Sequence, residues 1–580
     1  MSQVLADNPI SVATIPTITR HSQIGDPPEK ERGYSVQFYV DLILLGILSA
    51  FVLSCLSLLS PFLLLGAITQ RLYVARMQYH TEPHKQRIAV IGGGWSGLQC
   101  IAQLHELGVH DVRGFEQNDR WGGTWHPRLR YHNLQIHGAM WITSFKDFPY
   151  STDKDINDGK VSGEEVLRYI DRFGKEKNLM DAYTFNAQVI EIKYSTITVK
   201  KPHRSSPPTA KREATLVVKD SVTGKIWTEG PYDLVIYASI ASEPHIPDIP
   251  GRQDYKGQVL HSIDFKQEQY DSIVQSGKNV LLIGGSKSGC DMALCFQRSG
   301  YDNFNWLYRT PYLFFKYEYV FHDRSFKNVL RAFTTVVGSL ISLLSESLSG
   351  YVFWANGFAV SHGKDPRPHN NWSKFGFGIL CPKQRRDLAS ISQKRIIQGN
   401  PQAFTETGIC LSDGMTIDAD VVLFATGYES GMEKLNLTKN GIKFIHKSTT
   451  PLFNHYFVPD FPVLANAANL FTTYGPLRGV NLADMAVYHL CVRRQLTEKQ
   501  MEQSAKHHFG STNTVSGFFF QKHTNSIKLF ILLHLDLLIW GIVNIVDLSV
   551  HYINFFCFAN QTAIKIRLPK LKLSNVSEEP

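Results

Sequence analysis

Two glycine-rich turns in this 580-residue chain have the residue types and the spacing to hold a dinucleotide. The first lies in "RIAVIGGGWSGLQC", where Gly92, Gly94 and Gly97 separate a short apolar run from an amphipathic one. This order predicts a strand, a turn and a helix. Gly92 permits the tight turn, Gly94 lets backbone approach a pyrophosphate, and Gly97 lets the helix pack on the strand. The helix N-terminus would then present free N–H groups to the phosphates.

An acidic residue ends the strand that follows the first turn. The segment "DVRGFE" ends at Glu116, whose carboxylate can accept hydrogen bonds from ribose hydroxyl groups. A carboxylate repels a ribose 2′-phosphate, so this site is predicted to take FAD or NAD and not NADP. Trp95 and Ser96, inside the turn, are included among the predicted cofactor contacts. The alternative is an ordinary surface glutamate after a strand.

The second turn, "LLIGGSKSGCD", repeats this design with Gly284 and Gly289, but Ser286 stands where the pattern has its second glycine. The strand after it, "NFNWLYRT", ends in Arg309 and Thr310 where the first unit ended in an acid. A guanidinium group can bind a 2′-phosphate through two hydrogen bonds. The second turn is therefore predicted to bind NADP.

Ser286 leaves the second turn open to more than one interpretation. Its side chain is small, so a pyrophosphate could still approach, with the hydroxyl as an added donor. Lys287 and Ser288, inside the turn, are predicted as further phosphate contacts. The alternatives are that Arg309 is an ordinary surface charge and that the loop is a turn without a ligand.

Composition indicates a globular protein with some membrane contact, because 43% of the residues are apolar and 19% are charged. The net charge is +9, and no basic run interleaves with aromatic residues, so nucleic acid is not an expected partner. The eight cysteines are scattered, without a C-x-x-C pair or a Cys/His spacing suited to zinc. No metal site is predicted.

Two apolar stretches indicate contact with a membrane. The run from Leu42 to Ile68 has no charged residue and is long enough to span a bilayer. A cleaved signal peptide and a buried core helix are its alternatives. The run from Leu529 to Val546 carries His534 and Asp536, which are costly in hydrocarbon, so an interfacial helix is preferred over a second span. Membrane lipid is thus an expected partner.

Four further segments, in this order, resemble the class B flavoprotein monooxygenases, which include flavin-containing monooxygenases, YUCCA-type enzymes and Baeyer–Villiger monooxygenases. The resemblance covers roughly Lys85 to Val492. The segments are "DRWGGTW" with Gly123, Thr124 and Trp125; the fingerprint "YKGQVLHSIDF" with Tyr255, Gly257, His261 and Phe265; "DVVLFATGYE" with Thr426 and Gly427; and "ANLFTTYGPLRGVNLADM" with Gly475, Pro476 and Gly479.

The resemblance implies an α/β fold of two Rossmann-like dinucleotide-binding domains, in which the NADP domain is inserted in the FAD domain. The apolar run of residues 42–68 adds an expected N-terminal transmembrane helix before them. The expected organisation is a leader (1–41), the anchor (42–68), the FAD domain in two parts (85–240 and 413–495), the NADPH domain (250–412), and a C-terminal membrane-associated helix with a basic tail (520–580).

The resemblance also implies a reaction. NADPH would reduce FAD, and a flavin C4a-hydroperoxide would transfer one oxygen atom from O2 to a small organic substrate. The fingerprint ends in Phe265, not in the Trp that is usual in Baeyer–Villiger members, so oxygenation at N or S is expected. The alternatives are ketone oxygenation, an NADPH oxidase, and an inactive membrane-anchored binding protein. The expected location is the endoplasmic reticulum membrane, with the catalytic part in the cytosol.

The chain departs from the family pattern in two places. The first linker, usually A-T-G, reads Ala238, Ser239, Ile240. His137 stands where animal members carry a functional Asn, and Asn133 lies close by; these two are the predicted catalytic groups, bonding to the flavin adduct or to NADP. His261 is expected to shape the domain junction.

Overall fold

The computed structural model describes residues 81–136, 144–148, 150, 161–199, 209–239, 243–316, 359–360, 362, 378–447, 452–453, 456–466, 475–492 and 497–506. All of them belong to the second of two compact units, Ser60–Pro580; the first unit is Met1–Leu59. The predicted anchor, 42–68, and the predicted interfacial helix, 529–546, lie outside the described residues. None of the helices formed by the described residues has the length and apolar character needed to cross a bilayer.

A first parallel sheet carries the first glycine turn. Its strand order is β23-β7-β1-β2-β3, and Ile88 of β1 pairs with Leu234 on one side and Val112 on the other. Strands buried on both faces read as continuous apolar runs, as β7 ("LVIY") does. The strands are β1 (Arg87–Ile91), β2 (Asp111–Phe115), β3 (Tyr183–Thr184), β7 (Leu234–Tyr237) and β23 (Leu464–Asn466).

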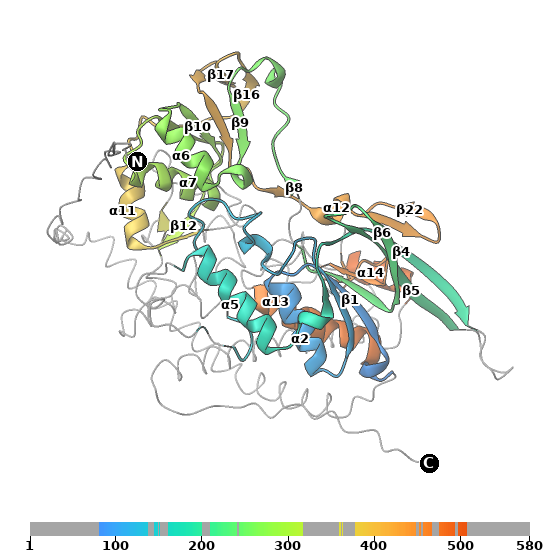
Figure 1. Cartoon of the computed structure of the whole chain (residues 1–580). Coiled ribbons are helices and arrows are strands. Elements are labelled where there is room, and N and C mark those ends of the chain that lie inside the picture. Colours follow the sequence, from blue (N-terminus) through green and yellow to red (C-terminus); the bar gives the residue numbers. More distant parts are fainter. Residues whose placement is uncertain are drawn as a thin grey trace, which may run out of the picture. The chain divides into compact units, whose positions relative to one another are not determined.

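Helix α2 (Trp95–Glu106) packs against α13 (Gly475–Val487) beside this sheet, as Figure 1 shows. The contact is close at Gly479, where a Cβ atom would lie 2.4 Å from the carbonyl oxygen of Ser96. Leu98, Ile236 and Leu482 belong to the core that these elements share. The packing fixes the N-terminal end of α2 over the carboxyl edge of the sheet.

A second parallel sheet carries the second turn, with strand order β15-β11-β10-β19-β9. Leu282, Met292, Trp306 and Leu423 lie in its own core, under α7. In the chain, all of these strands fall between β7 and β23 of the first sheet. The elements are β9 (Gln258–His261), α6 (Gln267–Gln275), β10 (Val280–Ile283), α7 (Lys287–Arg298), β11 (Phe304–Tyr308), β15 (Ile396–Gln398) and β19 (Val421–Phe424). The predicted α/β class with parallel sheets is confirmed.

The chain leaves the first sheet and returns to it through a paired ribbon. Strands β8 (Glu243–Pro244) and β20 (Tyr428–Glu429) pair antiparallel. The pairing is extended by the backbone N–H of His245, which donates to Gly427 O over 2.9 Å. The two connections therefore act as one unit.

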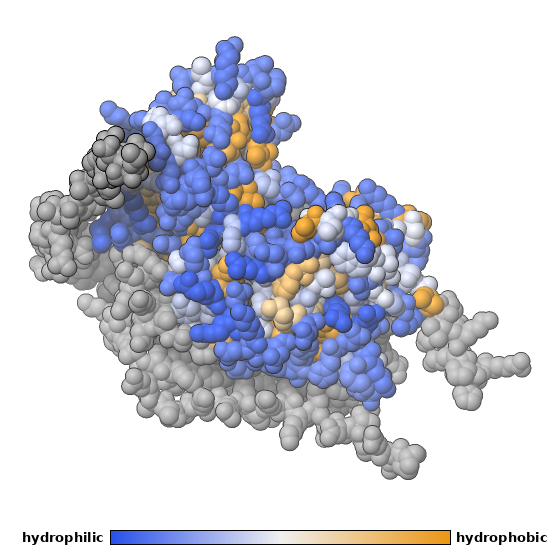
Figure 2. All heavy atoms as spheres, viewed as in Figure 1, coloured by the Kyte–Doolittle hydropathy of each residue, from blue (hydrophilic) through white to orange (hydrophobic). Residues whose placement is uncertain are grey.

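A third sheet, of order β22-β21-β4-β5-β6, packs beside the first. Figure 2 shows apolar atoms near β22 on the visible face, where Ile442 and Ile445 are 74% and 71% exposed. Exposed apolar side chains are common on protein surfaces. The sheet comprises β4 (Ala187–Val199), β5 (Thr209–Asp220), β6 (Ile226–Tyr232), β21 (Asn436–Lys439) and β22 (Ile442–Phe444).

Smaller elements complete the described part. Two three-stranded sheets comprise β12 (Phe314–Lys316), β13 (Ala359–Val360) and β14 (Gly378–Leu380), and β16 (Pro401–Phe404), β17 (Gly408–Leu411) and β18 (Thr416–Asp418). The remaining helices include η2 (Gly123–Trp125), α5 (Gly163–Glu176), α11 (Pro382–Ser390), α12 (Gly431–Lys434), the π-helix η7 (Tyr488–Val492) and α14 (Glu498–Lys506).

Candidate cofactor-binding sites

The first glycine turn joins β1 to α2 as predicted. Gly92 has φ +112°, a conformation that L side chains rarely adopt. A Cβ atom on Gly97 would lie 2.0 Å from the carbonyl oxygen of Gly92, so the helix can approach the turn only with glycine there. The hydroxyl of Tyr183 donates to the same carbonyl over 3.2 Å. These two glycines are therefore required by the protein itself.

Gly94 is different, because the protein leaves room beside it. A Cβ atom there would meet Gly123 Cα at 3.5 Å, an ordinary contact. Gly94 is the N-cap of α2, and no side chain caps the helix. Trp95 Nε1 is buried and has no hydrogen-bond partner among the described residues. Because Gly94 has no side chain, a pyrophosphate can approach the uncapped N–H groups at the start of α2 closely. These residues therefore fit a dinucleotide.

Glu116 is buried, with 4% of its surface exposed, and it braces the first turn. Its Oε2 accepts from Gly93 N over 2.6 Å, and its Oε1 accepts from Asn118 N and Nδ2 over 2.9 and 2.7 Å. Burial raises the pKa of Glu116, against the opposing effect of these hydrogen bonds. One lone pair on Oε2 remains for a ribose hydroxyl. An ordinary surface glutamate is excluded.

The segment containing Gly123, Thr124 and Trp125 lies against the first turn. Gly122 N donates to Gly93 O over 3.0 Å, and a Cβ atom on Gly123 would lie 2.9 Å from Gly94 Cα. The Trp125 ring meets the Trp95 ring edge to face, at 5.6 Å between centroids. The structure thus brings the predicted flavin-side residues together.

The second turn repeats the geometry of the first. Gly284 has φ +139°, and a Cβ atom on Gly289 would lie 2.0 Å from the carbonyl oxygen of Gly284. That carbonyl accepts from an aromatic donor, Trp306 Nε1, over 2.7 Å. Ser288 Oγ lies 3.4 Å from Ala425 O on the neighbouring strand's end. The fold therefore builds the same loop twice.

Ser286 occupies the place of Gly94 without strain. Its φ and ψ are −86° and −168°, against −86° and −172° at Gly94, and such extended backbone suits any residue. Ser286 is the N-cap of α7, yet its side chain makes no capping hydrogen bond. The first N–H groups of α7 and the Ser286 hydroxyl remain available to a ligand.

Lys287 does not point at the helix N-terminus. Its ammonium group pairs with Asp291, and the two side chains are 12% and 8% exposed. The other oxygen of Asp291 accepts from the hydroxyl of Tyr131 over 2.7 Å. The phosphate contact predicted for Lys287 would require its ammonium group to leave this pair.

Arg309 follows β11 directly, as Glu116 follows β2. Arg309 is exposed, and its guanidinium group has no hydrogen-bond partner among the described residues. The backbone oxygen of Thr310 would lie 3.2 Å from a Cβ atom on Gly285. Both predicted residues therefore lie next to the second turn, at the carboxyl edge of the sheet.

His362 was not predicted from the sequence, which holds no signal for it. Its Nε2–H donates to Gly285 O over 2.7 Å, and its Nδ1 accepts from Tyr312 N over 3.4 Å. The ring stacks on Tyr308 at 4.1 Å. Burial lowers the pKa of His362 to about 4, so the ring is neutral. It holds the second turn where Glu116 holds the first.

Thr426 and Gly427 lie at the ribbon between the sheets. The hydroxyl of Thr426 donates to His245 O. His261 is fully buried, and its Nε2–H donates to Gly427 O over 2.9 Å while its Nδ1 accepts from Ile263 N over 3.3 Å. Burial lowers the pKa of His261, which keeps the ring neutral in this arrangement.

The two predicted catalytic residues are placed differently. His137 lies outside the described residues, as does Ile240 of the first linker. Asn133 has φ +59°, and its Nδ2 lies 2.8 Å from His132 Nε2 and 3.5 Å from Cys295 Sγ. Its amide therefore faces α7, and its catalytic role stays a prediction.

Comparison with known proteins agrees with this geometry. Residues 85–304 match the sequence model of the family described as flavin-binding monooxygenase-like. The chain is 26% identical to a probable flavin-containing monooxygenase 1 of Arabidopsis thaliana, over 60% of this chain and 71% of that protein. It is 28% identical to flavin-containing monooxygenase 5 of Homo sapiens, over 66% of this chain and 68% of that protein.

Among solved structures, a crystal structure of an OTEMO complex with FAD and NADP aligns with a TM-score of 0.50 and 15% identity. The alignment covers 70% of this chain and 85% of that one, and it supports the fold. The two glycine turns, the flavin-side segment and these relatives together support an assignment to the class B flavoprotein monooxygenase family.

Proposed function

We propose that this enzyme transfers one oxygen atom from O2 to nitrogen or sulfur of a small organic substrate, with FAD in the first turn and NADPH in the second. It is a flavin-dependent monooxygenase, and its cofactors are FAD and NADPH. One observation carries the assignment of each cofactor to its turn: two loops of the same geometry are followed by opposite charges, Glu116 and Arg309.

The first turn has the groups to bind FAD. The uncapped N–H groups of α2 are donors for the pyrophosphate, and the absence of a side chain at Gly94 lets the pyrophosphate approach them. Glu116 has one lone pair left for a ribose hydroxyl, and its charge disfavours a phosphate on that ribose. When bound, the flavin and the nicotinamide supply the electron transfer and the activation of O2, which side chains cannot perform.

The second turn has the groups to bind NADPH. The uncapped N–H groups of α7 are donors for the pyrophosphate, and the Ser286 side chain is small enough to leave them accessible. Arg309 is exposed beside the turn and can form a bidentate contact with the 2′-phosphate. His362 and the ribbon at Gly427 hold the turn and the linkers in place.

Support for oxygenation at a heteroatom comes from the family resemblance, because the fingerprint ends in Phe265 where Baeyer–Villiger members usually carry Trp. The side chain of Phe265 is fully buried and meets Phe296 edge to face at 5.6 Å. This contact lies inside the core of the nucleotide domain. The proposal keeps ketone oxygenation as the competing reaction, because both share the cofactors and the fold.

The proposal is tested by supplying purified, flavin-loaded enzyme with NADPH and labelled O2. A thioether and a ketone of matched size are offered separately. We expect label in the sulfoxide, with one NADPH consumed per product. Label in an ester from the ketone would support the Baeyer–Villiger reaction instead, and peroxide as the sole product would support an oxidase.

The proposed location is the endoplasmic reticulum membrane, with the catalytic part in the cytosol. It is supported by the uncharged apolar run of residues 42–68. Deletion of residues 1–70 is expected to release the protein only partly, because residues 529–546 remain. Protease protection of the C-terminal part in intact microsomes would place it in the lumen and overturn the orientation.

A further inference from the structure

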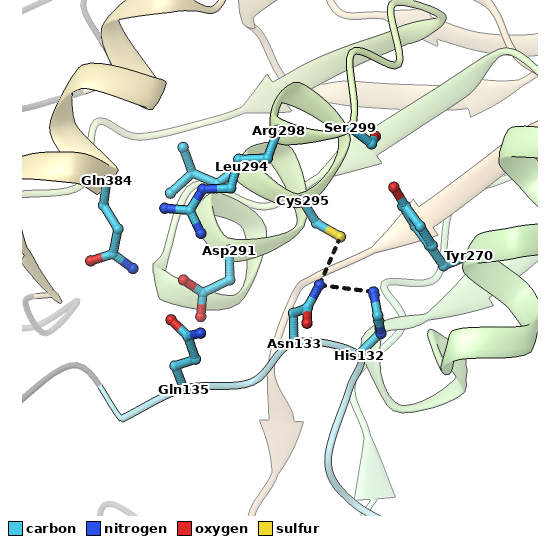
Figure 3. Close-up of a pocket in the computed structure, with 10 residues that line it drawn as sticks. All are labelled: His132, Asn133, Gln135, Tyr270, Asp291, Leu294, Cys295, Arg298, Ser299 and Gln384. Carbon is cyan, nitrogen blue, oxygen red and sulfur yellow. Dashed lines mark hydrogen bonds between the residues drawn. The ribbon is translucent and has the colours of Figure 1, made fainter. Parts of the chain in front are cut away.

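A pocket of about 250 Å³ opens between the two cofactor domains, away from both glycine turns. One wall is the segment 131–136 from the flavin side, and the others are α6, α7 and α11 of the nucleotide domain (Figure 3). It is lined by the second half of α7, from Asp291 to Arg298, whereas the phosphate donors lie at the first turn of that helix. The pocket is therefore separate from the NADPH cradle.

One end of the pocket holds unpaired hydrogen-bond donors. Arg298 uses Nε to bind Asp387 Oδ2 over 2.6 Å, which leaves its two terminal nitrogens without a partner among the described residues. Gln384 accepts from Cys381 N over 3.0 Å through Oε1, so its Nε2 remains a donor. Gln384 is 8% exposed and faces the pocket in Figure 3. A guanidinium group beside an amide donor matches a carboxylate.

Asp291 also lines the pocket, but both of its carboxylate oxygens already accept hydrogen bonds. One of its oxygens accepts from Lys287, and the other accepts from Tyr131. The positive charge of Lys287 offsets the negative charge of the Asp291 carboxylate. Arg298 is offset in the same way by Asp387, yet the guanidinium still has unused N–H groups, and those hydrogen bonds would bind an anion.

The other end of the pocket is less polar. The rings of His132 and Tyr270 stack at 4.8 Å, and Leu294 and Cys295 line the wall from α7. Burial lowers the pKa of His132, so its ring adds an uncharged surface. Figure 3 shows the aromatic pair and Cys295 on one side of Asn133, and Gln384 and Arg298 toward the other.

We propose that this pocket binds a small organic carboxylate. The carboxylate group contacts the terminal nitrogens of Arg298 and Nε2 of Gln384, and an apolar body of a few carbons lies against Leu294 and Tyr270. The volume suits a molecule of amino-acid size. Residues of 131–136 and of α7 both line the pocket, so the ligand would lie where the flavin and nucleotide domains meet. The site does not depend on the reaction that the enzyme catalyses.

The test is isothermal titration of the full-length, FAD-loaded protein in detergent with benzoate, and with benzamide as the uncharged control. We expect saturable benzoate binding with a dissociation constant on the order of millimolar or tighter, and at least about tenfold weaker benzamide binding. Arg298→Gln is expected to weaken benzoate binding at least about tenfold. The matched control is Arg395→Gln, which removes a similar ion pair, to Asp302 at 2.6 Å, outside the pocket.

A second measurement needs no variant. Bound benzoate should slow alkylation of Cys295, which lines the pocket, and leave alkylation of Cys410 unchanged, with both peptides followed by mass spectrometry. The proposal is overturned if wild type shows no saturable benzoate binding. It is also overturned if Arg298→Gln and Arg395→Gln bind benzoate equally, or if benzoate shifts the flavin spectrum without protecting Cys295, because the ligand would then lie at the flavin.

Discussion

The two glycine turns share a backbone but differ in every side chain that can tell one nucleotide from another. Both have a first glycine at positive φ, and in both a Cβ atom added to the last glycine would lie 2.0 Å from the carbonyl oxygen of the first. The residue after the first glycine is hydrogen-bonded to Glu116 in the first turn and to His362 in the second. After the next strand comes a buried acid in one and an exposed Arg309 in the other. The fold supplies the cradle, and the flanking charge selects the cofactor.

The largest effect is expected from Gly289→Ala. The new Cβ atom would lie 2.0 Å from the Gly284 carbonyl, so α7 must move away from the turn. Overpacking against backbone costs about 1–3 kcal/mol or more, and the displaced helix should lose measurable NADPH binding. Flavin content should be retained, since Gly97 serves the other turn. Loss of both cofactors would show that the turns are not independent.

Arg309→Ala sharpens the assignment of the 2′-phosphate. Hydrogen bonds to charged groups contribute about 1.5–3 kcal/mol, so the Michaelis constant for NADPH should rise about 10- to 100-fold. The constant for NADH should stay within about twofold of wild type. Steady-state oxidation of each nucleotide measures this, and equal losses for both would remove the 2′-phosphate assignment.

His362, which holds the second turn, is expected to make the stability of the fold depend on pH. The pKa of His362 is lowered from 6.5 to about 4 in the folded state, so the unfolded state binds the proton first. Stability should therefore fall as pH drops below 6.5, by about 1.4 kcal/mol per pH unit.

Between pH 6.5 and pH 5 this amounts to about 2 kcal/mol, or a fall in melting temperature of about 4–8 °C. His362→Gln can still donate to Gly285 and does not titrate, so its melting temperature should fall less. Burial also lowers the pKa of His261 and His446, and the comparison with the variant removes their contribution. Identical slopes in variant and wild type would contradict this role.

The smallest effect is expected from Ser286→Gly. The serine adopts the same backbone conformation as Gly94 and makes no capping hydrogen bond, so nothing in the protein depends on its hydroxyl. The dissociation constant for NADP+ should change by less than about threefold. A larger rise would mean that the hydroxyl binds the pyrophosphate, and a larger fall would mean that it obstructs it.

Sequence patterns predicted both cradles because glycine spacing reports a local constraint. Gly97 and Gly289 are required by the carbonyl groups of Gly92 and Gly284, five residues earlier, and Gly92 and Gly284 themselves adopt positive φ. Long-range partners could not be predicted in this way. Tyr183 reaches Gly92 from 91 residues away, and His362 reaches Gly285 from 77. Trp306 lay inside a quoted strand, but only the register of β11 shows that its indole meets Gly284.

The direction in which a side chain points was the other feature that the sequence could not predict. Lys287 had the right place in the sequence for a phosphate contact, but Asp291 one helical turn later draws its ammonium group away from the N-terminus. Asn133, predicted beside the flavin, has its amide toward Cys295 on α7. Spacing predicts which residues share a turn or a helix face, while charge partners decide where a flexible side chain points.

The most direct test of the two-cofactor account is anaerobic reduction of the bound flavin, followed by its absorbance after mixing with NADPH or NADH. We expect that wild type carries FAD and that NADPH reduces it at least about tenfold more efficiently than NADH, because Arg309 contacts the 2′-phosphate. Protein without flavin, or equal reduction by the two nucleotides, would contradict it.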